Sequence, residues 1–89
     1  MKLSHEQYLK IKTVILRKLV IHNIWGAKHT NYEFVQKGLP KDLRGSAKDV
    51  ADDLIKNGIL LSHPTGYGMQ ISLNPDMANE IKAVLGIEN

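Results

Sequence analysis

The sequence has 89 residues, a length that suits one domain. It contains no cysteine, which excludes disulfides and thiolate metal sites, and its hydrophobic residues, 43% of the total, are spread along most of the chain. The net charge of +3 is unevenly distributed, because residues 1–44 carry nine Lys and Arg against three acids (+6) and residues 45–89 carry three against six (−3).

No segment predicts secretion or a membrane anchor. The start of the chain lacks a long apolar run before a cleavage site, and the most apolar stretch, residues 13–25, is interrupted by Arg17 and Lys18. We therefore expect a soluble, cytoplasmic protein.

The first predicted element is a long helix. Ser4 and Gln7 have the spacing of a capping box, apolar residues recur at helical spacing as far as Trp25, and Gly26 is expected to end the helix. The apolar arc is wider than one small domain needs on a single helix. This width predicts a homodimer that forms through the first helix.

A short strand and a second helix are expected next. Residues 27–29 suit a minor strand. Thr30 and Glu33 have the spacing of a second capping box, which would open a short helix that ends near Gly38.

The third helix follows a turn at residues 39–40 and one helical turn at residues 41–44. Ser46, with Asp49 at the capping-box position, is expected to cap this helix. The pair at residues 57–58, Asn-Gly, should end it.

The last part of the chain predicts a hairpin and a closing helix. Residues 59–62 are apolar, residues 64–68 are rich in turn formers, and residues 69–73 alternate between apolar and polar. Asn74 is placed to cap a final helix that ends at Gly86.

This order of elements resembles the winged-helix superfamily. The segments that carry the resemblance are D-L-I-K-N-G-I-L (Asp53 to Leu60) and G-Y-G-M-Q-I-S-L (Gly66 to Leu73). In that superfamily a helix ends in a lysine-glycine or asparagine-glycine pair, and an apolar dipeptide starts the wing. After a tip that contains glycine, the chain returns as a strand that alternates between apolar and polar residues. The resemblance covers about residues 4 to 86.

The resemblance implies an α+β winged helix-turn-helix as one domain over residues 1–89. It would have a long N-terminal helix, a three-helix core, a two-stranded wing hairpin with a short third strand as an option, and a C-terminal helix. The segment between Gly38 and Gly58 is longer than the usual turn and recognition helix, which leaves the start of the third helix open. The pattern H-T-x-x-x-x-x-x-K-G-x-P-K-x-L-R-G, from His29 to Gly45, also resembles small, poorly characterised prokaryotic proteins. No activity follows from either likeness, since many unrelated functions share one fold.

By position, the resemblance implies a nucleic-acid interface at the helix-turn-helix and the wing. Four cations near the helix-turn-helix can contact phosphates, the start of the third helix would lie nearest the major groove, and the wing tip offers a hydroxyl and an aromatic ring. The candidate nucleic-acid-binding residues are Lys28, Lys37, Lys41, Arg44, Ser46, Lys48, Thr65 and Tyr67.

Other features favour a different interpretation. Between Arg44 and Lys56 three basic residues face three acidic ones, which fits a solvated charge stripe, and no Lys or Arg lies in residues 57–81. The candidate lysines can equally be solvated surface residues, and residues 64–68 can be an ordinary hairpin tip. The cations of the first helix are expected to be solvated on its outer face.

Two hypotheses follow. The first is a double-stranded-DNA-binding transcriptional regulator that acts as a homodimer, and the alternative is a winged-helix interaction module without DNA binding. RNA binding through the same basic front is a third option. Catalysis finds no support, because the sequence shows no phosphate-binding glycine loop and no nucleophile with a base nearby. The histidines, at positions 5, 22, 29 and 63, lack metal-ligand spacing, and we predict no metal, cofactor, membrane or small-molecule ligand.

Overall fold

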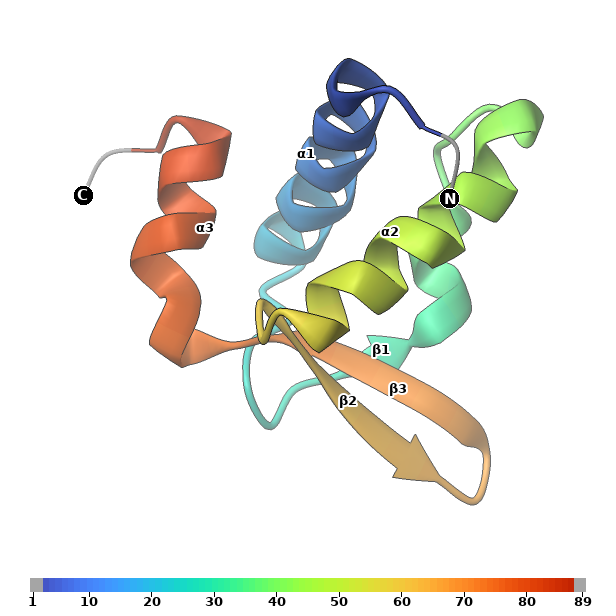
Figure 1. Ribbon diagram of the computed structural model, residues 1–89. Coiled ribbons are helices and arrows are strands. Elements are labelled where there is room, and N and C mark those ends of the chain that lie inside the picture. Colours follow the sequence, from blue (N-terminus) through green and yellow to red (C-terminus); the bar gives the residue numbers. More distant parts are fainter. Residues whose placement is uncertain (1–2, 88–89) are drawn as a thin grey trace.

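The computed structural model describes residues 3–87, which form an α+β fold of three α-helices and a three-stranded antiparallel sheet (Figure 1). In chain order the elements are α1 (His5–Ile21), β1 (Thr30–Asn31), the 3-10 helices η1 (Tyr32–Gln36) and η2 (Lys41–Leu43), α2 (Arg44–Lys56), β2 (Leu60–Thr65), β3 (Gly68–Leu73), the 3-10 helix η3 (Pro75–Met77) and α3 (Ala78–Leu85). This layout is compatible with the order predicted for a winged helix.

Helix α1 begins as predicted and ends earlier than predicted. The Ser4 side chain accepts from the Gln7 N–H at 3.0 Å, and the Gln7 side chain accepts from the Ser4 N–H at 3.0 Å, so the capping box is confirmed. The helix stops at Ile21 because Asn23 takes a left-handed conformation, with a φ of 56°. The N–H of Ile24 then donates to the Leu19 carbonyl at 2.9 Å, which closes the helix end.

The prediction that Gly26 ends α1 is therefore wrong, and β3 explains why. Leu73 donates its N–H to the Ile24 carbonyl at 2.8 Å and accepts from the Gly26 N–H at 3.0 Å. These bonds hold residues 24–26 beside β3, where Trp25 forms an isolated bridge with Leu73. The backbone here serves the sheet and cannot continue the helix.

The short strand β1 lies later than predicted, at residues 30–31 instead of 27–29. Thr30 pairs with Ile71 of β3, so Thr30 belongs to the sheet. The capping box predicted at Thr30 is wrong as a result, since η1 starts after Asn31 without a side-chain cap.

Helix α2 begins at Arg44, two residues before the predicted cap. Ser46 is half-buried inside the first turn and caps nothing, and the start of α2 has no side-chain capping bond. The reason is that η2 runs directly into α2, with Leu43 already in a helical conformation. The predicted end is confirmed, because Gly58 has a φ of 78° and the Ile59 N–H donates to the Leu54 carbonyl at 2.9 Å.

The predicted hairpin is confirmed. Strands β2 and β3 pair from Leu60↔Leu73 to Thr65↔Gly68, which leaves a two-residue tip. The strand order is β1-β3-β2, so β2 is an edge strand, and it carries Pro64 opposite Met69. At the end of the sheet, Asn74 accepts from the Asp76 N–H at 3.0 Å and thereby caps η3, which leads into α3. Gly86, with a φ of 70°, ends α3 as predicted.

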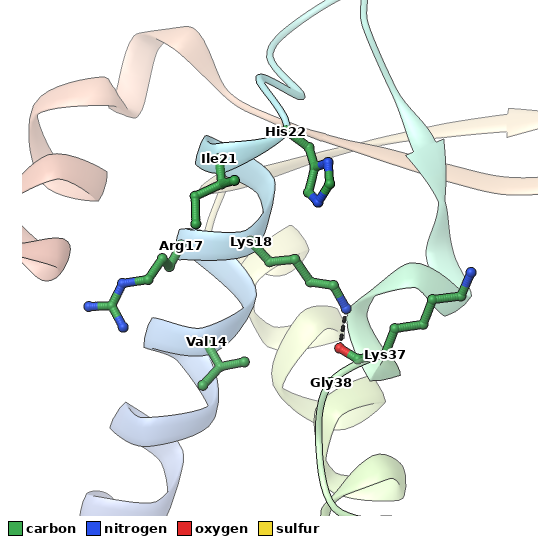
Figure 2. A pocket seen from close by; sticks show the side chains of 7 residues that line it. All are labelled: Val14, Arg17, Lys18, Ile21, His22, Lys37 and Gly38. Carbon is green, nitrogen blue, oxygen red and sulfur yellow. Dashed lines mark hydrogen bonds between the residues drawn. The ribbon is translucent and has the colours of Figure 1, made fainter.

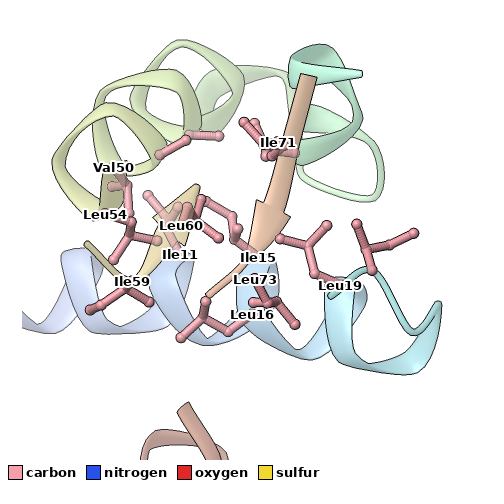
Figure 3. Close-up of a cluster of buried hydrophobic side chains, with 14 of the residues drawn as sticks. Ile11, Ile15, Leu16, Leu19, Val50, Leu54, Ile59, Leu60, Ile71 and Leu73 are labelled. Carbon is pink, nitrogen blue, oxygen red and sulfur yellow. The ribbon is translucent and has the colours of Figure 1, made fainter. Parts of the chain in front are cut away.

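One hydrophobic cluster joins the helices and the sheet (Figure 3). Helix α1 contributes four side chains with at most 1% exposure, which are Ile11, Ile15, Leu16 and Leu19. Helix α2 contributes Ala47, Val50, Ala51 and Leu54, all at 0%. The sheet adds Leu60, Ile71 and Leu73, and α3 adds Ile81.

Most of the apolar arc of α1 is therefore used inside the domain. Val14 and Val20 also pack against the cluster, and Leu9 (41%) and Ile21 (71%) are the large apolar side chains of α1 that remain exposed. The arc alone no longer requires a partner subunit. Within residues 3–87, every helix is too short or too polar to cross a bilayer.

Candidate nucleic-acid interface

Helix α2 is fixed to η1 by polar contacts along one side. The Tyr32 hydroxyl donates to the Lys48 carbonyl at 2.9 Å and also contacts the Asp52 carboxylate. Nearer the start of the helix, the Gln36 amide donates to the Arg44 carbonyl at 2.9 Å. The first half of α2, where the candidate interface was predicted, is thereby held in a defined position.

A second tyrosine, on α1, also bonds to α2. The Tyr8 hydroxyl of α1 donates to the Asp53 carboxylate. Burial, followed by this bond and the charge of Asp53, raises the pKa of Tyr8 to about 12. Burial and the Asp52 carboxylate likewise raise the pKa of Tyr32. Two of the three acids on α2 thus accept hydrogen bonds from tyrosine hydroxyls and have a structural role.

Two of the predicted phosphate contacts come together at the start of α2. Lys37 and Arg44 line one hollow of about 260 Å³, with Glu33 and Gln36 as its other walls. The Arg44 Nε donates to the Leu39 carbonyl at 3.4 Å, which turns the side chain back toward the preceding loop. The Arg44 N–H itself donates to the Lys41 carbonyl, because η2 runs directly into α2.

The other predicted cations are more scattered. Lys41 lies in η2, and Lys48 is exposed on α2. Lys28 lies in the α1–β1 loop, which Figure 1 shows at the opposite end of the molecule from the start of α2. The fold therefore does not bring all four cations of the predicted phosphate track together. These cations are Lys28, Lys37, Lys41 and Arg44.

The outer face of α2 carries charges of both signs. Lys48, Asp49, Asp52 and Lys56 are all exposed there, as the charge-stripe interpretation expects. Ser46 is half-buried, so it offers little to a groove.

At the hairpin tip, the two predicted residues differ in what they leave available. The Thr65 hydroxyl donates to the Gly68 carbonyl at 2.8 Å and accepts from the Tyr67 N–H at 3.1 Å, so it is used within the turn. The Tyr67 side chain is 99% exposed. Tyr67 is therefore the side chain that the tip exposes to solvent.

Sequence reasoning missed Lys18. It was expected to be solvated on the outer face of α1, but its ammonium donates to the Phe34 carbonyl at 2.7 Å and also to the Lys37 carbonyl. The ammonium lies 4.4 Å from the centre of the Phe34 ring, a cation–π contact. Burial, and then the charge of Lys37, lowers the pKa of Lys18. Its place between Val14 and Ile21 on one helical face was the available signal.

Two histidines stack beside the middle of the hairpin. The rings of His29 and His63 stack with their centres 4.8 Å apart, and His29 bonds to the Gln70 amide oxygen at 3.2 Å. The part of the chain that the structure describes contains no group of three or more His, Cys, Asp or Glu suited to a metal ion.

Comparison with protein-family models, with curated proteins and with solved structures gave no match to this chain.

Proposed function

We propose that the chain is a winged-helix protein that binds duplex DNA through the start of α2 and the tip of the β2–β3 hairpin. The supporting observation is the pair Lys37 and Arg44, which line one hollow at the start of a 13-residue helix. Two cations that line one hollow both attract a phosphate group, and the guanidinium of Arg44 can also donate hydrogen bonds to it.

In this proposal the hairpin acts as the wing. Tyr67 would contact the sugar–phosphate backbone or a groove with its ring and hydroxyl, since 99% of its side chain is exposed. Lys41 lies between Lys37 and Arg44 in the sequence, and Lys48 follows Arg44 by one helical turn. Both would supply further phosphate contacts.

A homodimer and a role in transcription regulation belong to the same proposal. Leu9 and Ile21 on α1 and Val84 on α3 are large apolar side chains exposed on the monomer, which supports a contact between two copies. A dimer would present two helix starts to two half-sites on the DNA.

Fluorescence anisotropy with a labelled random duplex at several salt concentrations tests the proposal. The variant Lys37→Ala/Arg44→Ala removes the cations of the hollow, and Lys10→Ala/Lys12→Ala removes two cations of α1 as a matched control. Each lost phosphate contact should reduce the slope of log K against log salt by about 0.9, so the first variant should lose about 1.8. The control should keep the slope of the parent chain. Equal binding by the parent and the first variant would refute the proposed interface.

A second candidate function is a winged-helix interaction module that does not bind DNA. The observation in its favour is the outer face of α2, where Asp49 and Asp52 offset Lys48 and Lys56, beside a hairpin that lacks cations. Three results together would favour this module. The chain should capture a cellular protein even after nuclease treatment, the Tyr67→Ala variant should not capture it, and the parent chain should not bind the duplex at low salt. Preference for single-stranded RNA over the duplex in the same assay would favour RNA binding instead.

A further inference from the structure

A second hollow, distinct from the one at the start of α2, lies between the last turns of α1 and the turn after η1. It measures about 280 Å³ and is lined by Val14, Arg17, Lys18, Ile21, His22, Lys37 and Gly38 (Figure 2). Below, this hollow is called the α1 pocket. Apolar side chains form part of its wall, because Val14 and Ile21 lie on the same side of α1 and Ile21 is 71% exposed.

The polar groups of the α1 pocket are cationic. Figure 2 shows Lys18 reaching across to the Lys37 carbonyl, while the Arg17 guanidinium projects from the other side of α1. Lys18 and Lys37 both approach the Phe34 ring, with ammonium-to-centre distances of 4.4 Å and 5.9 Å. The His22 ring meets the same phenylalanine edge-on at 5.3 Å.

No carboxylate lines the α1 pocket among the residues described, and Glu33 belongs to the neighbouring hollow on the Lys37 side. Burial and then the charge of Lys37 lower the pKa of Lys18, and no acid among the lining residues offsets the two like charges. An anion placed beside them would gain attraction from both, and an apolar group attached to it could cover the exposed side chain of Ile21.

We infer that the α1 pocket binds a small organic anion that has an apolar body, such as a medium-chain or aromatic carboxylate. The carboxylate would lie against Lys18 and Lys37, and the hydrocarbon part would cover Val14 and Ile21. Arg17 would close over the ligand from the other rim. This inference does not depend on DNA binding.

Nuclear magnetic resonance titrations with three probes test the inference. Octanoate carries both features, acetate carries only the charge, and 1-octanol carries only the chain. Octanoate should shift the amide signals of Val14, Ile21 and Gly38, and it should bind at least about tenfold more tightly than acetate, since partial burial of a few methylene groups suffices for that difference. Equal binding of octanoate and acetate, or of octanoate and octanol, would overturn the inference.

Variants locate the site. Arg17→Gln and Lys37→Gln should each weaken octanoate binding about three- to fivefold, as expected for the loss of one partly exposed ion pair. Ile21→Ser should lower the affinity for octanoate toward the affinity for acetate. Lys56→Gln removes the same charge from the exposed face of α2 and should leave the affinity unchanged. Equal weakening by Lys56→Gln, or octanoate shifts centred on Trp25, would show that the α1 pocket is not the site.

Discussion

Two groups of basic residues in this chain differ in how their surroundings balance the charge. On the outer face of α2, Lys48 and Lys56 each have Asp52 one helical turn away, and all three side chains are exposed. Around Phe34, Lys18 is half-buried and Lys37 lies beside it, with no acid in the α1 pocket. Cations of the same type are therefore solvated on one helix and held by backbone carbonyls on another.

The difference arises from the element that packs over each helix. The Lys48 and Lys56 side chains of α2 are exposed, whereas η1 and the turn at residues 37–38 lie against the last turns of α1 and supply two carbonyl acceptors to Lys18. A lysine beneath such a turn stabilises the packing of the turn on the helix.

The largest expected effect comes from removing the structural lysine. Lys18→Met keeps the length of the side chain but leaves the Phe34 and Lys37 carbonyls without their ammonium donor. The free energy of unfolding should fall by about 1–2 kcal/mol, because hydrogen bonds from charged donors are lost. Urea unfolding measures this loss. Lys48→Met on α2 is the matched control and should change stability by less than about 0.5 kcal/mol; a loss as large as that of Lys18→Met would remove the distinction between the two groups.

A smaller effect is expected where an acid of α2 is held in place. Tyr8→Phe removes the donor to Asp53 and should lower the free energy of unfolding by about 1 kcal/mol. Thermal or urea unfolding near pH 7 checks this value. If stability is unchanged, the bond between α1 and α2 contributes nothing measurable.

The same tyrosine predicts a dependence of stability on alkaline pH. The folded pKa of Tyr8, about 12, lies above the ordinary value of 10.0, so the folded state holds the phenolic proton more tightly than the unfolded state does. The contribution is fully present below pH 10 and is lost as the pH rises from 10 toward 12. Urea midpoints measured across this window should fall less steeply for Tyr8→Phe than for the parent chain, and parallel curves would contradict the assignment.

The smallest effect sharpens the comparison through charge alone. Because the charge of Lys37 lowers the pKa of Lys18, Lys37→Gln should raise that pKa, and Lys56→Gln should leave it where it is. Titration of the lysine side-chain signals by nuclear magnetic resonance reports the shift. If both variants raise the pKa of Lys18 equally, that pKa depends on the net charge of the protein and not on Lys37 in particular.

Local patterns in the sequence predicted the elements whose ends are set locally. The capping box at Ser4, the stop at Gly58 and the strand at residues 69–73 are each decided by residues close together in the chain, and the structure confirms them. The predicted alternation of burial along that strand is wrong, because Met69 is exposed near the hairpin tip and Ser72 is buried, where its hydroxyl donates to the Gly26 carbonyl. Thr30 and Ser46 have equally good capping patterns, but pairing with Ile71 and the run of η2 into α2 override them. The end of α1 was misplaced for the same reason, since β3 holds residues 24–26.

The candidate interface was predictable only in part. Lys37 and Arg44 are neighbours because a short turn joins their elements, and the sequence placed them together. Lys28 was grouped with them by nearness in the chain, but the α1–β1 loop carries it elsewhere (Figure 1). Lys18 was missed because its partner Phe34 follows 16 residues later, in an element whose packing on α1 no local pattern reveals.

Pro64 near the end of edge strand β2 limits how copies of this chain can associate. An edge strand offers unpaired backbone groups to a strand of another molecule, but proline has no N–H to donate and interrupts such a ladder. Because Pro64 lies close to the tip, a ladder added along β2 would be confined to the base of the hairpin. The proline therefore shortens the stretch of β2 that could pair with a strand of another copy.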